Sequence, residues 1–226
     1  MAKTATRRVP RARLTSHLVI MAKTPRAGRV KRRLARGIGD VAATRFYRTC
    51  LGHTLLRLSR DPRWRTRLAI APDRDRDASL WSGMMSPSIG RLEQGDGALG
   101  ERMQRLFSRL PPGPAIIVGG DIPSIGAAEV ARAFRLLSTA DAVLGPAADG
   151  GYWLVGLRRS PRLIAPFANV RWSSPHAFAD TLRNLGGRRL ALAAMLSDVD
   201  TAAACRSAGD TWQRLIPSRP RRSAAN

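Results

Sequence analysis

The sequence predicts an α/β fold, with a mainly parallel sheet and helices on both of its faces. Two observations support this prediction. Short apolar runs alternate along the chain with longer segments in which apolar residues recur every three or four positions, and strands that alternate with helices build parallel sheets. Several of the apolar runs are also continuous, as expected of strands that are buried on both faces. The length of 226 residues is typical of one domain with a sizeable core.

The first half of the chain supplies most of the predicted sheet. A buried strand is expected at residues 17–22, and a helix is expected at 40–60, with Asp40 in position to cap its N-terminus. The other elements expected in this half are strands at 67–71, 89–94 and 114–118 and a helix at 101–110. The run at 114–118 is the clearest buried strand of the sequence, so the residues that follow it deserve attention as candidates for function.

The second half continues this alternation and then becomes less regular. The elements expected there are strands at 142–144, 152–157 and 189–195 and helices at 127–138, 175–185 and 201–215. Residues 1–16 and 217–226 are rich in arginine and are expected to be disordered basic extensions. Residues 17–216 are then the folded domain.

The composition is strongly basic. The chain has 39 Lys and Arg against 16 Asp and Glu, a net charge of +23. Such a charge suits phosphorylated small molecules, an acidic membrane surface or nucleic acid. Aromatic residues make up only 5% of the chain and do not interleave with the cations, so nucleic acid is not the expected partner.

The cysteines and the hydrophobic pattern bear on the compartment. Cys50 and Cys205 have no metal-ligand spacing and are expected to be buried free thiols in a reducing environment. The pair Arg7–Arg8 is followed by an apolar run that is too short for a secretory signal, and no stretch reaches the length of a transmembrane helix. We therefore expect a cytoplasmic protein.

A basic loop follows the first predicted strand. Pro25 and Gly28 break regular structure there, and six Lys or Arg residues lie between positions 23 and 33. Only three lysines occur in the whole chain, and two of them, Lys23 and Lys31, lie in this loop. The lysine ammonium is a compact point charge, which arginine does not reproduce. The loop therefore predicts a phosphate-binding site, with a solvated basic loop as the structural alternative.

Carboxylates follow the predicted strands at three places. They are Asp121 after the strand at 114–118, Asp149 before two glycines, and Asp198 and Asp200 after the strand at 189–195. Ligands of open α/β sheets bind at the carboxyl ends of the strands, and carboxylates at that edge can hold Mg²⁺ or Mn²⁺. An Asp after a strand can equally form a turn or cap a helix, so each has a structural alternative.

Six segments occur in the order found in a known family. They are Ala-Lys-Thr-Pro-Arg-Ala-Gly-Arg-Val-Lys-Arg-Arg-Leu34, Leu-Gly-Glu-Arg-Met103, Gly-Asp-Ile-Pro123, Gly-Pro-Ala-Ala-Asp-Gly-Gly-Tyr-Trp153, Trp172-Ser173 and Asp198-Val-Asp-Thr201. With them the chain resembles, over about residues 17–210, the bacterial glycosyltransferase-like family that is found beside radical-SAM and selenodomain proteins and is sometimes assigned to arsenosugar synthesis.

The resemblance implies a single domain of the nucleotide-diphospho-sugar transferase (GT-A) type, a three-layer α/β/α sandwich. It implies that the nucleotide phosphates are held by Lys23, Gly28, Arg29, Lys31 and Arg33, and that the catalytic residues are Lys23, Lys31 and Asp121. The metal, Mg²⁺ or Mn²⁺, would be bound by Asp121, with Asp200 or Asp198 as a second ligand. The pocket for the transferred group or its acceptor would be shaped by Asp149, Gly150, Gly151, Tyr152, Trp172 and Ser173.

The expected function is that of a metal-dependent glycosyltransferase, which moves a sugar from a nucleotide-sugar to a small acceptor. The alternative is a guanylyltransferase-like nucleotidyltransferase that couples a nucleoside triphosphate to a small phosphorylated substrate. That alternative is favoured by Asp121, which stands alone where sugar transferases of this fold commonly have an Asp-x-Asp pair. A third alternative is a catalytically weakened nucleotide-binding or partner protein, because Arg32 and Ala98 replace the Thr and Asp that the family usually has.

Overall fold

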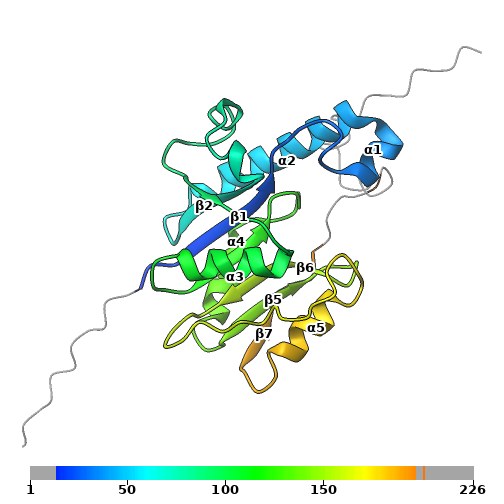
Figure 1. The fold of residues 1–226 in the computed structure, drawn as a ribbon. Coiled ribbons are helices and arrows are strands. Elements are labelled where there is room, and N and C mark those ends of the chain that lie inside the picture. The colour runs from blue at the N-terminus through cyan, green and yellow to red at the C-terminus, as the bar shows by residue number, and fades with distance from the viewer. Residues whose placement is uncertain (1–13, 197–200, 202–226) are drawn as a thin grey trace, which may run out of the picture.

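The computed structural model describes residues 14–196 together with Thr201. A seven-stranded sheet forms its centre, with the strand order β3-β2-β1-β4-β6-β5-β7 (Figure 1). The strands are β1 (His17–Lys23), β2 (Arg65–Ala71), β3 (Gly90–Glu93), β4 (Ala115–Gly119), β5 (Ala142–Pro146), β6 (Tyr152–Leu157) and β7 (Leu190–Leu192). Each strand that the sequence predicts in this part of the chain is present, within a few residues of its expected ends.

Most neighbouring strands run parallel, as the sequence predicts. Strand β1 pairs in parallel with β2 and β4, β2 with β3, and β5 with β7. Strand β6 is antiparallel to both β4 and β5, because a tight turn after β5 returns the chain directly. The carboxyl ends of β1, β2 and β4 therefore meet at one edge of the sheet, and β6 begins at that same edge with Tyr152.

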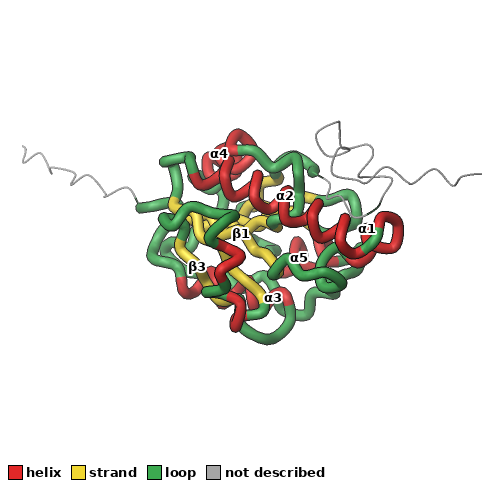
Figure 2. Tube along the Cα trace, turned by 90° about the horizontal axis from the view of Figure 1, so that it is seen from above, coloured by secondary structure: helices red, strands yellow, loops and turns green. Residues whose placement is uncertain are grey.

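The helices cover both faces of the sheet, which confirms the three-layer α/β/α arrangement. They are α1 (Arg32–Ile38), α2 (Asp40–Ser59), α3 (Leu99–Arg109), α4 (Ala127–Leu136) and α5 (Ala177–Asn184), with 3₁₀ turns η1 (Asp73–Asp75) and η2 (Ser79–Trp81). Figure 2 shows α2 and α4 on one face and α3 and α5 on the other. Two hydrophobic cores result, and neighbouring residues of β1 serve different ones, Leu18 the first and Val19 the second, since successive strand side chains point to opposite faces.

Helix α2 buries the face that the sequence predicts. Its buried apolar residues are Ala42, Ala43, Phe46, Tyr47, Cys50, Leu51, Leu55 and Leu58. Burial, together with the nearby charge of Asp121, raises the pKa of the Cys50 thiol to about 12, which agrees with an inert buried thiol. The prediction that Asp40 caps this helix is wrong. Gly39 is the N-cap, with φ 85°, because α1 ends at Ile38 and leaves one residue to turn the chain, and glycine adopts positive φ without steric cost.

The C-terminal predictions are tested only in part. The strand expected at 189–195 is present but is confined to Leu190–Leu192. The helix expected from Thr201, the carboxylates Asp198 and Asp200, Cys205 and almost all of both basic extensions lie outside the described residues. Within the described ranges, no helix is both long enough and apolar enough to cross a membrane.

Candidate functional site

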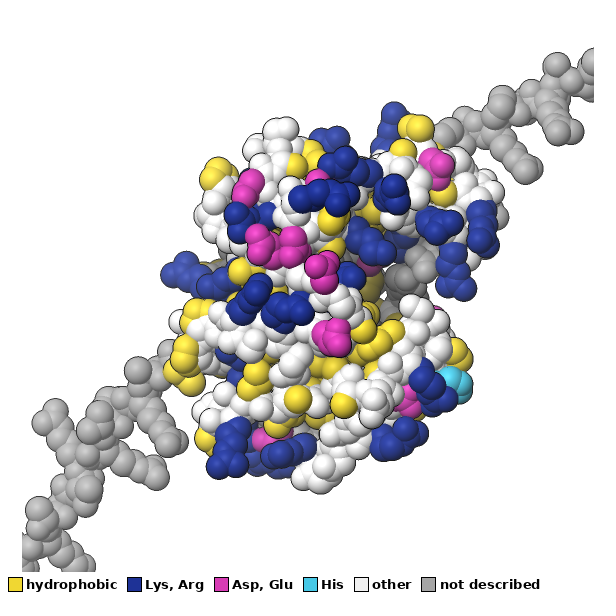
Figure 3. All heavy atoms as spheres, in the orientation of Figure 1, with side chains coloured by type: hydrophobic (Ala, Val, Ile, Leu, Met, Phe, Trp, Pro, Cys, Tyr) yellow, Lys and Arg dark blue, Asp and Glu magenta, His cyan; other side chains and the backbone are white. Residues whose placement is uncertain are grey.

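A cleft of about 1000 Å³ lies at the edge of the sheet where β1 and β4 end and β6 begins. Its lining includes ten of the residues that the sequence predicts for the site: Lys23, Arg29, Lys31, Arg33, Asp121, Asp149, Gly151, Tyr152, Trp172 and Ser173. Gly28 and Gly150 belong to the same loops but are not part of the lining. In Figure 3, Lys and Arg side chains gather over α1 and the loop before it, and the surface is hollowed below them. The structure thus brings segments distant in sequence to one cavity.

An ion pair between Lys31 and Asp121 lies in this cleft. The Lys31 Nζ is 2.9 Å from Asp121 Oδ2, and the exposed fractions of the two side chains are 3% and 34%. Lys31 is the N-cap of α1 and has a left-handed backbone, with φ 46° and ψ 45°, which is uncommon for a non-glycine residue. This conformation turns the lysine inward from a loop whose arginines are exposed. The structure therefore joins the second lysine of the basic loop to the carboxylate after β4.

Lys23, the first lysine of the loop, is held through its backbone. The Tyr47 hydroxyl accepts a hydrogen bond from Lys23 N at 2.9 Å and donates one to Lys23 O at 3.1 Å. Burial raises the pKa of Tyr47, and the charge of Asp121 raises it further, so this hydroxyl keeps the proton that it donates. Helix α2 thereby fixes the end of β1, and the Lys23 side chain remains exposed at the cleft.

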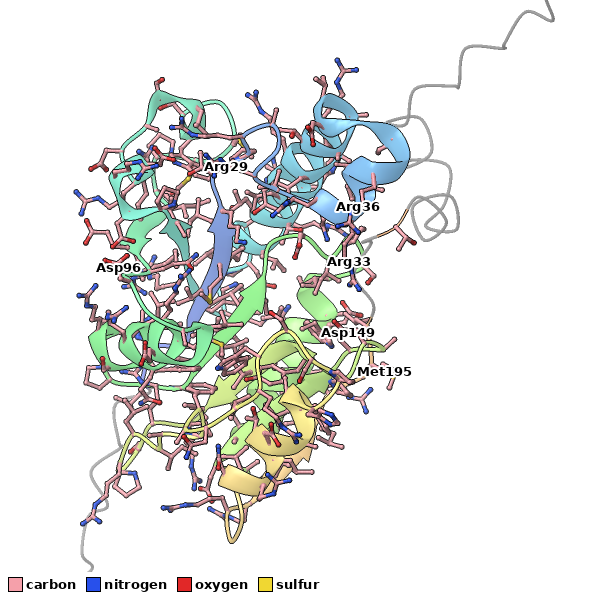
Figure 4. The ribbon with its side chains drawn as sticks, turned by 45° about the vertical axis from the view of Figure 1, so that its right-hand side comes forward. Arg29, Arg33, Arg36, Asp96, Asp149 and Met195 are labelled. Carbon is pink, nitrogen blue, oxygen red and sulfur yellow. The ribbon has the colours of Figure 1, made fainter. Side chains whose placement is uncertain are left out.

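The arginines of the loop divide into two groups. Arg26 turns away and donates to Asp75 at 2.7 Å, outside the cleft. Arg29 and Arg33 line the cleft, and Figure 4 shows them on one side of the opening with Asp149 on the other. In the part of the chain that the structure describes, Lys23 and Arg29 have no carboxylate partner. We refer to Lys23, Arg29, Lys31 and Arg33 as the cationic wall.

The opposite side of the cleft is formed by aromatic side chains. The rings of Tyr152 and Trp172 lie 6.1 Å apart at 71°, an edge-to-face arrangement, and we refer to this pair as the aromatic wall. Helix α3 packs directly against it at Gly100, where a Cβ atom would lie 2.8 Å from Trp172 Cζ2. Three residues of the segment Leu-Gly-Glu-Arg-Met103 therefore have identifiable structural roles. Only glycine at position 100 allows the close approach to Trp172. Glu101 accepts a hydrogen bond from Ala98 N at 2.9 Å, and the Met103 side chain is buried in the second hydrophobic core.

A buried carboxylate holds the loop that bears Trp172. Asp180, on α5, accepts hydrogen bonds from Arg171 Nε and Arg171 Nη2, both at 2.8 Å, and from Arg171 N at 3.1 Å. These hydrogen bonds lower the pKa of Asp180. The interaction was not expected from the sequence, although an Arg directly before the motif Trp172-Ser173 is a visible signal. Its effect is that the buried Asp180 carboxylate anchors the backbone and the side chain of Arg171, directly before Trp172.

Asp149 occupies the turn between β5 and β6. Its Oδ1 accepts from Gly151 N at 2.9 Å, and Gly150 has φ 82°. The carboxylate therefore has the turn-forming role that was its structural alternative, while it also lines the cleft. Glycine adopts the positive φ found at Gly150 without steric cost.

Gln94 is a cleft residue that the sequence did not single out for function. It follows β3, is 4% exposed, and donates from Nε2 to Ala22 O at 3.1 Å and to Ala69 O at 2.8 Å. It therefore bridges the ends of β1 and β2 next to Lys23. A polar residue at the end of a weak strand was the signal available in the sequence.

The residues of the cleft offer limited ligation for a metal. No group of three or more His, Cys, Asp or Glu that could hold an ion occurs among the described residues, and Asp198 and Asp200 lie outside them. Mg²⁺ is usually held by one or two carboxylates together with substrate phosphates and water. Asp121 is partly exposed in a cationic cleft and can therefore serve as one such carboxylate ligand.

Residues 54–174, more than half of the chain, match the family described as "Uncharacterized protein conserved in bacteria (DUF2064)". The chain belongs to this family. The matched region contains Asp121, the β5–β6 turn and the aromatic wall, while the basic loop precedes it. No curated protein matches the sequence.

Several solved structures have a fold similar to that of this chain. A candidate nucleotide-diphospho-sugar transferase from Desulfovibrio desulfuricans G20 has a TM-score of 0.76 and 27% identity, over 83% of this chain and 84% of that one. The 4-diphosphocytidyl-2C-methyl-D-erythritol synthase of Anaerococcus prevotii DSM 20548 has a TM-score of 0.59 and 12% identity, over 88% and 99%. The inositol-1-phosphate CTP transferase of T. maritima has a TM-score of 0.53 and 12% identity, over 89% and 95%. The fold is therefore that of nucleotide-diphospho-sugar transferases, as the sequence predicts, and the last two likenesses show the fold alone.

Proposed function

We propose that this protein is a transferase that uses a nucleotide-activated donor, and that the group it transfers is a sugar passed to a small acceptor. The observation that supports this most directly is the composition of the cleft at the ends of β1 and β4. Its cationic wall contains exposed Lys23 and Arg29 together with the inward-facing Lys31, whereas its aromatic wall is uncharged. A nucleotide-sugar has the same division, because its diphosphate is anionic and its sugar is a neutral ring.

The cationic wall would act on the leaving group. In sugar transfer, the bond between the sugar C1 and the phosphate oxygen breaks, an acceptor oxygen forms a new bond to C1, and the nucleoside diphosphate leaves with the electron pair. Negative charge therefore develops on the diphosphate. Lysine and arginine side chains that are fixed before the reaction stabilise such charge without reorganising. Asp121 fixes the ammonium group of Lys31 in this way, and Tyr47 fixes the backbone from which the Lys23 side chain extends into the cleft.

Asp121 would have two roles in this proposal. It pairs with Lys31 at 2.9 Å and so orients the ammonium group. It is also the described carboxylate best suited to a divalent ion, with Asp198 and Asp200 as further proposed ligands. Bound Mg²⁺ or Mn²⁺ would neutralise phosphate charge as a Lewis acid.

Nucleotidyl transfer is the second candidate, and a specific observation favours it. Gly119 stands two residues before Asp121, so the paired carboxylates common in sugar transferases are absent at this strand end. In this alternative a phosphate of the small substrate attacks the α-phosphate of a nucleoside triphosphate, and pyrophosphate leaves. Two of the solved structures with this fold have names that refer to cytidylyl chemistry.

The leaving group distinguishes these two reactions. The protein is incubated with Mn²⁺ and either nucleotide-sugars with small acceptors, including precursors of arsenosugars, or nucleoside triphosphates with sugar phosphates. We expect release of nucleoside diphosphate in the first set, and loss of that release in Asp121→Ala, which excludes a contaminating enzyme. Release of pyrophosphate in the second set alone would replace the sugar-transfer proposal by the nucleotidyl one.

A third outcome concerns the substitutions Arg32 and Ala98. Arg32 is exposed at the start of α1 and lines the cleft, and Ala98 is the N-cap of α3. If nucleotides bind but no product forms in either set, the weakened binding protein becomes the better description. A cytoplasmic location is part of the proposal and is based on the sequence.

A further inference from the structure

Gln94 presents a hydrogen-bond acceptor to the cleft, and its orientation is determined by its partners. One end of the amide lies between two backbone carbonyl oxygens, Ala22 O at 3.1 Å and Ala69 O at 2.8 Å. Carbonyl oxygens only accept hydrogen bonds, so the amide NH₂ must be at this end. The amide oxygen, Oε1, is consequently at the other end.

The Oε1 atom is available to a ligand. It has no hydrogen-bond partner in the described part of the chain and is not enclosed away from solvent, although Gln94 as a whole is only 4% exposed. Gln94 is part of the cleft lining. The small accessible part of this side chain is therefore an acceptor at the cleft surface.

The segment around Gln94 is held firmly. Asp73 accepts from Gly95 N with both carboxylate oxygens, at 3.0 and 3.1 Å. Arg105 donates to Gln94 O at 2.7 Å, and Arg102 donates to Gly97 O at 2.8 Å. A ligand that fits this fixed arrangement of Gln94 binds more tightly, because the protein loses little conformational entropy on binding.

The position of Gln94 relative to the two walls indicates which part of a bound nucleotide it would contact. It bridges the ends of β1 and β2, whereas Tyr152 begins β6, two strands from β1 in the sheet. The cationic wall lies between them. In the proposed binding mode, the phosphates of a nucleotide contact Lys23 and Lys31, and the transferred group lies toward the aromatic wall. The base then lies on the side of Gln94. Leu99, which also lines the cleft, has an exposed apolar side chain that a base can contact.

We propose that Gln94 selects a nucleobase that bears an exocyclic amino group, as cytosine, adenine and guanine do. This inference is based on the proposed nucleotide-binding function. An amino group projects from the base edge and can donate to Oε1. In uracil the ring N–H is flanked by two oxo groups, whose lone pairs oppose an approaching acceptor. Uridine nucleotides are therefore the disfavoured ligands.

Calorimetric titration of the full chain with nucleoside diphosphates tests this selection. The probes are matched pairs that differ in the amino group: CDP and UDP, GDP and IDP, and ADP and purine riboside diphosphate. We expect one amino-bearing diphosphate to bind most tightly and its matched partner to bind roughly five- to tenfold more weakly, the value of one ordinary hydrogen bond. Tightest binding of UDP would overturn the proposal.

A variant shows whether Gln94 is responsible. In Gln94→Met, which keeps the side-chain length, the preference within the matched pair should fall to about twofold or less. Gln104→Met is the control, because Gln104 is a glutamine on α3 that donates to Ile164 O and is not part of the cleft lining, and it should keep the full preference. An unchanged preference in Gln94→Met overturns the role of Gln94.

The two proposals fail in different ways. If no nucleoside diphosphate binds the wild-type protein, the proposed function is wrong and the inference about Gln94 falls with it. If nucleotides bind tightly without a preference for the amino group, only the inference about Gln94 is wrong. If Gln94→Met is unfolded by circular dichroism, Gln94→Leu is titrated in its place, with the same expected loss of preference.

Discussion

The two walls of the cleft differ in how their charged side chains are paired. On the cationic wall, Lys23 and Arg29 have no carboxylate partner among the described residues, and the carboxylate of Asp121 meets a single described cation, Lys31. Behind the aromatic wall, the Asp180 carboxylate accepts three hydrogen bonds from Arg171 and one from Arg183. One wall thus keeps positive charge for a ligand, whereas the other presents two uncharged rings and has its nearest arginine paired with a carboxylate.

This difference shows how a strongly basic chain can still build a selective site. A net charge of +23 attracts every anion, and exposed cations spread over a surface distinguish little between them. Selection requires positions at which cations are fixed and positions at which they are absent. The cleft has both, within the width of a few strands.

The largest effect is expected from Lys31→Ala, on the cationic wall. The variant removes an ammonium group that is fixed beside the proposed leaving group, so turnover should fall roughly 100- to 1000-fold, as when one preorganised donor is lost from a catalytic site. The fold should persist, because Asp121 is partly exposed and can be solvated. Initial rates and circular dichroism measure the two quantities.

Arg36→Ala is the matched control for Lys31→Ala. Arg36 lies on the same short helix α1, is exposed and is not part of the cleft lining (Figure 4). It should retain turnover within about twofold, because an exposed charge far from the reacting atoms is screened by solvent. If both variants lose activity equally, the general positive charge matters and the position of Lys31 does not.

The second effect concerns the charge balance behind the aromatic wall. Asp180→Asn removes the negative charge and one of the two oxygens that accept from Arg171, so the loop that bears Trp172 should loosen. The melting temperature should fall, and KM for the acceptor should rise roughly tenfold while the affinity for the nucleotide is unchanged, since only one side of the cleft is misplaced. A fall in nucleotide affinity of the same size would show that the two walls are not independent.

The same pair predicts a pH dependence. The hydrogen bonds from Arg171 lower the pKa of Asp180 below its ordinary value. A depressed carboxyl pKa stabilises the fold above the pKa of the unfolded chain, and this stabilisation is lost as the pH falls through the folded-state pKa. The stability difference between wild type and Asp180→Asn should therefore be constant at neutral pH and shrink below about pH 4. A difference that grows on acidification would contradict this assignment.

A smaller effect is expected at the turn that supports the aromatic wall. In Gly150→Ala the new Cβ would meet the backbone of Pro175, at a residue with φ 82°, and such strain costs about 1 to 3 kcal/mol. The control is Gly52→Ala in α2, where a Cβ would meet nothing within 4 Å. That variant should gain about 0.5 to 1 kcal/mol. Urea denaturation of the two variants should give shifts of opposite sign, and shifts of equal sign would refute the described turn.

The smallest effect is expected from Tyr47→Phe, which loosens the cationic wall without removing a charge. The variant loses both hydrogen bonds to the Lys23 backbone, so stability should fall by about 1 to 2 kcal/mol. Nucleotide affinity should fall about threefold or less, because the ammonium of Lys23 remains. Loss of nucleotide binding altogether would mean that the hydroxyl itself contacts the ligand.

Much of the architecture could be predicted because it depends on the spacing of apolar residues within short segments of the sequence. The buried face of α2 follows from residues at helical spacing, and Asp121 could be found because it follows the most apolar strand. The cap of α2 was mispredicted because Gly39 is needed to turn the chain after α1, a helix that no periodicity indicated. Gln94 and Asp180 were missed as site residues because their partners, Ala22, Ala69 and Arg171, are identified only by the folded structure.

The central claim is that the cationic wall binds the phosphates of a nucleotide. It is tested most directly by the melting temperature of the wild-type protein with nucleoside diphosphates and Mg²⁺ or Mn²⁺. At a concentration about 100 times Kd, a bound nucleotide should raise the melting temperature by about 5 to 10 °C. The same nucleotide should have little effect on Lys31→Ala and its full effect on Arg36→Ala. A melting temperature that no nucleotide raises, with either metal, would contradict the account.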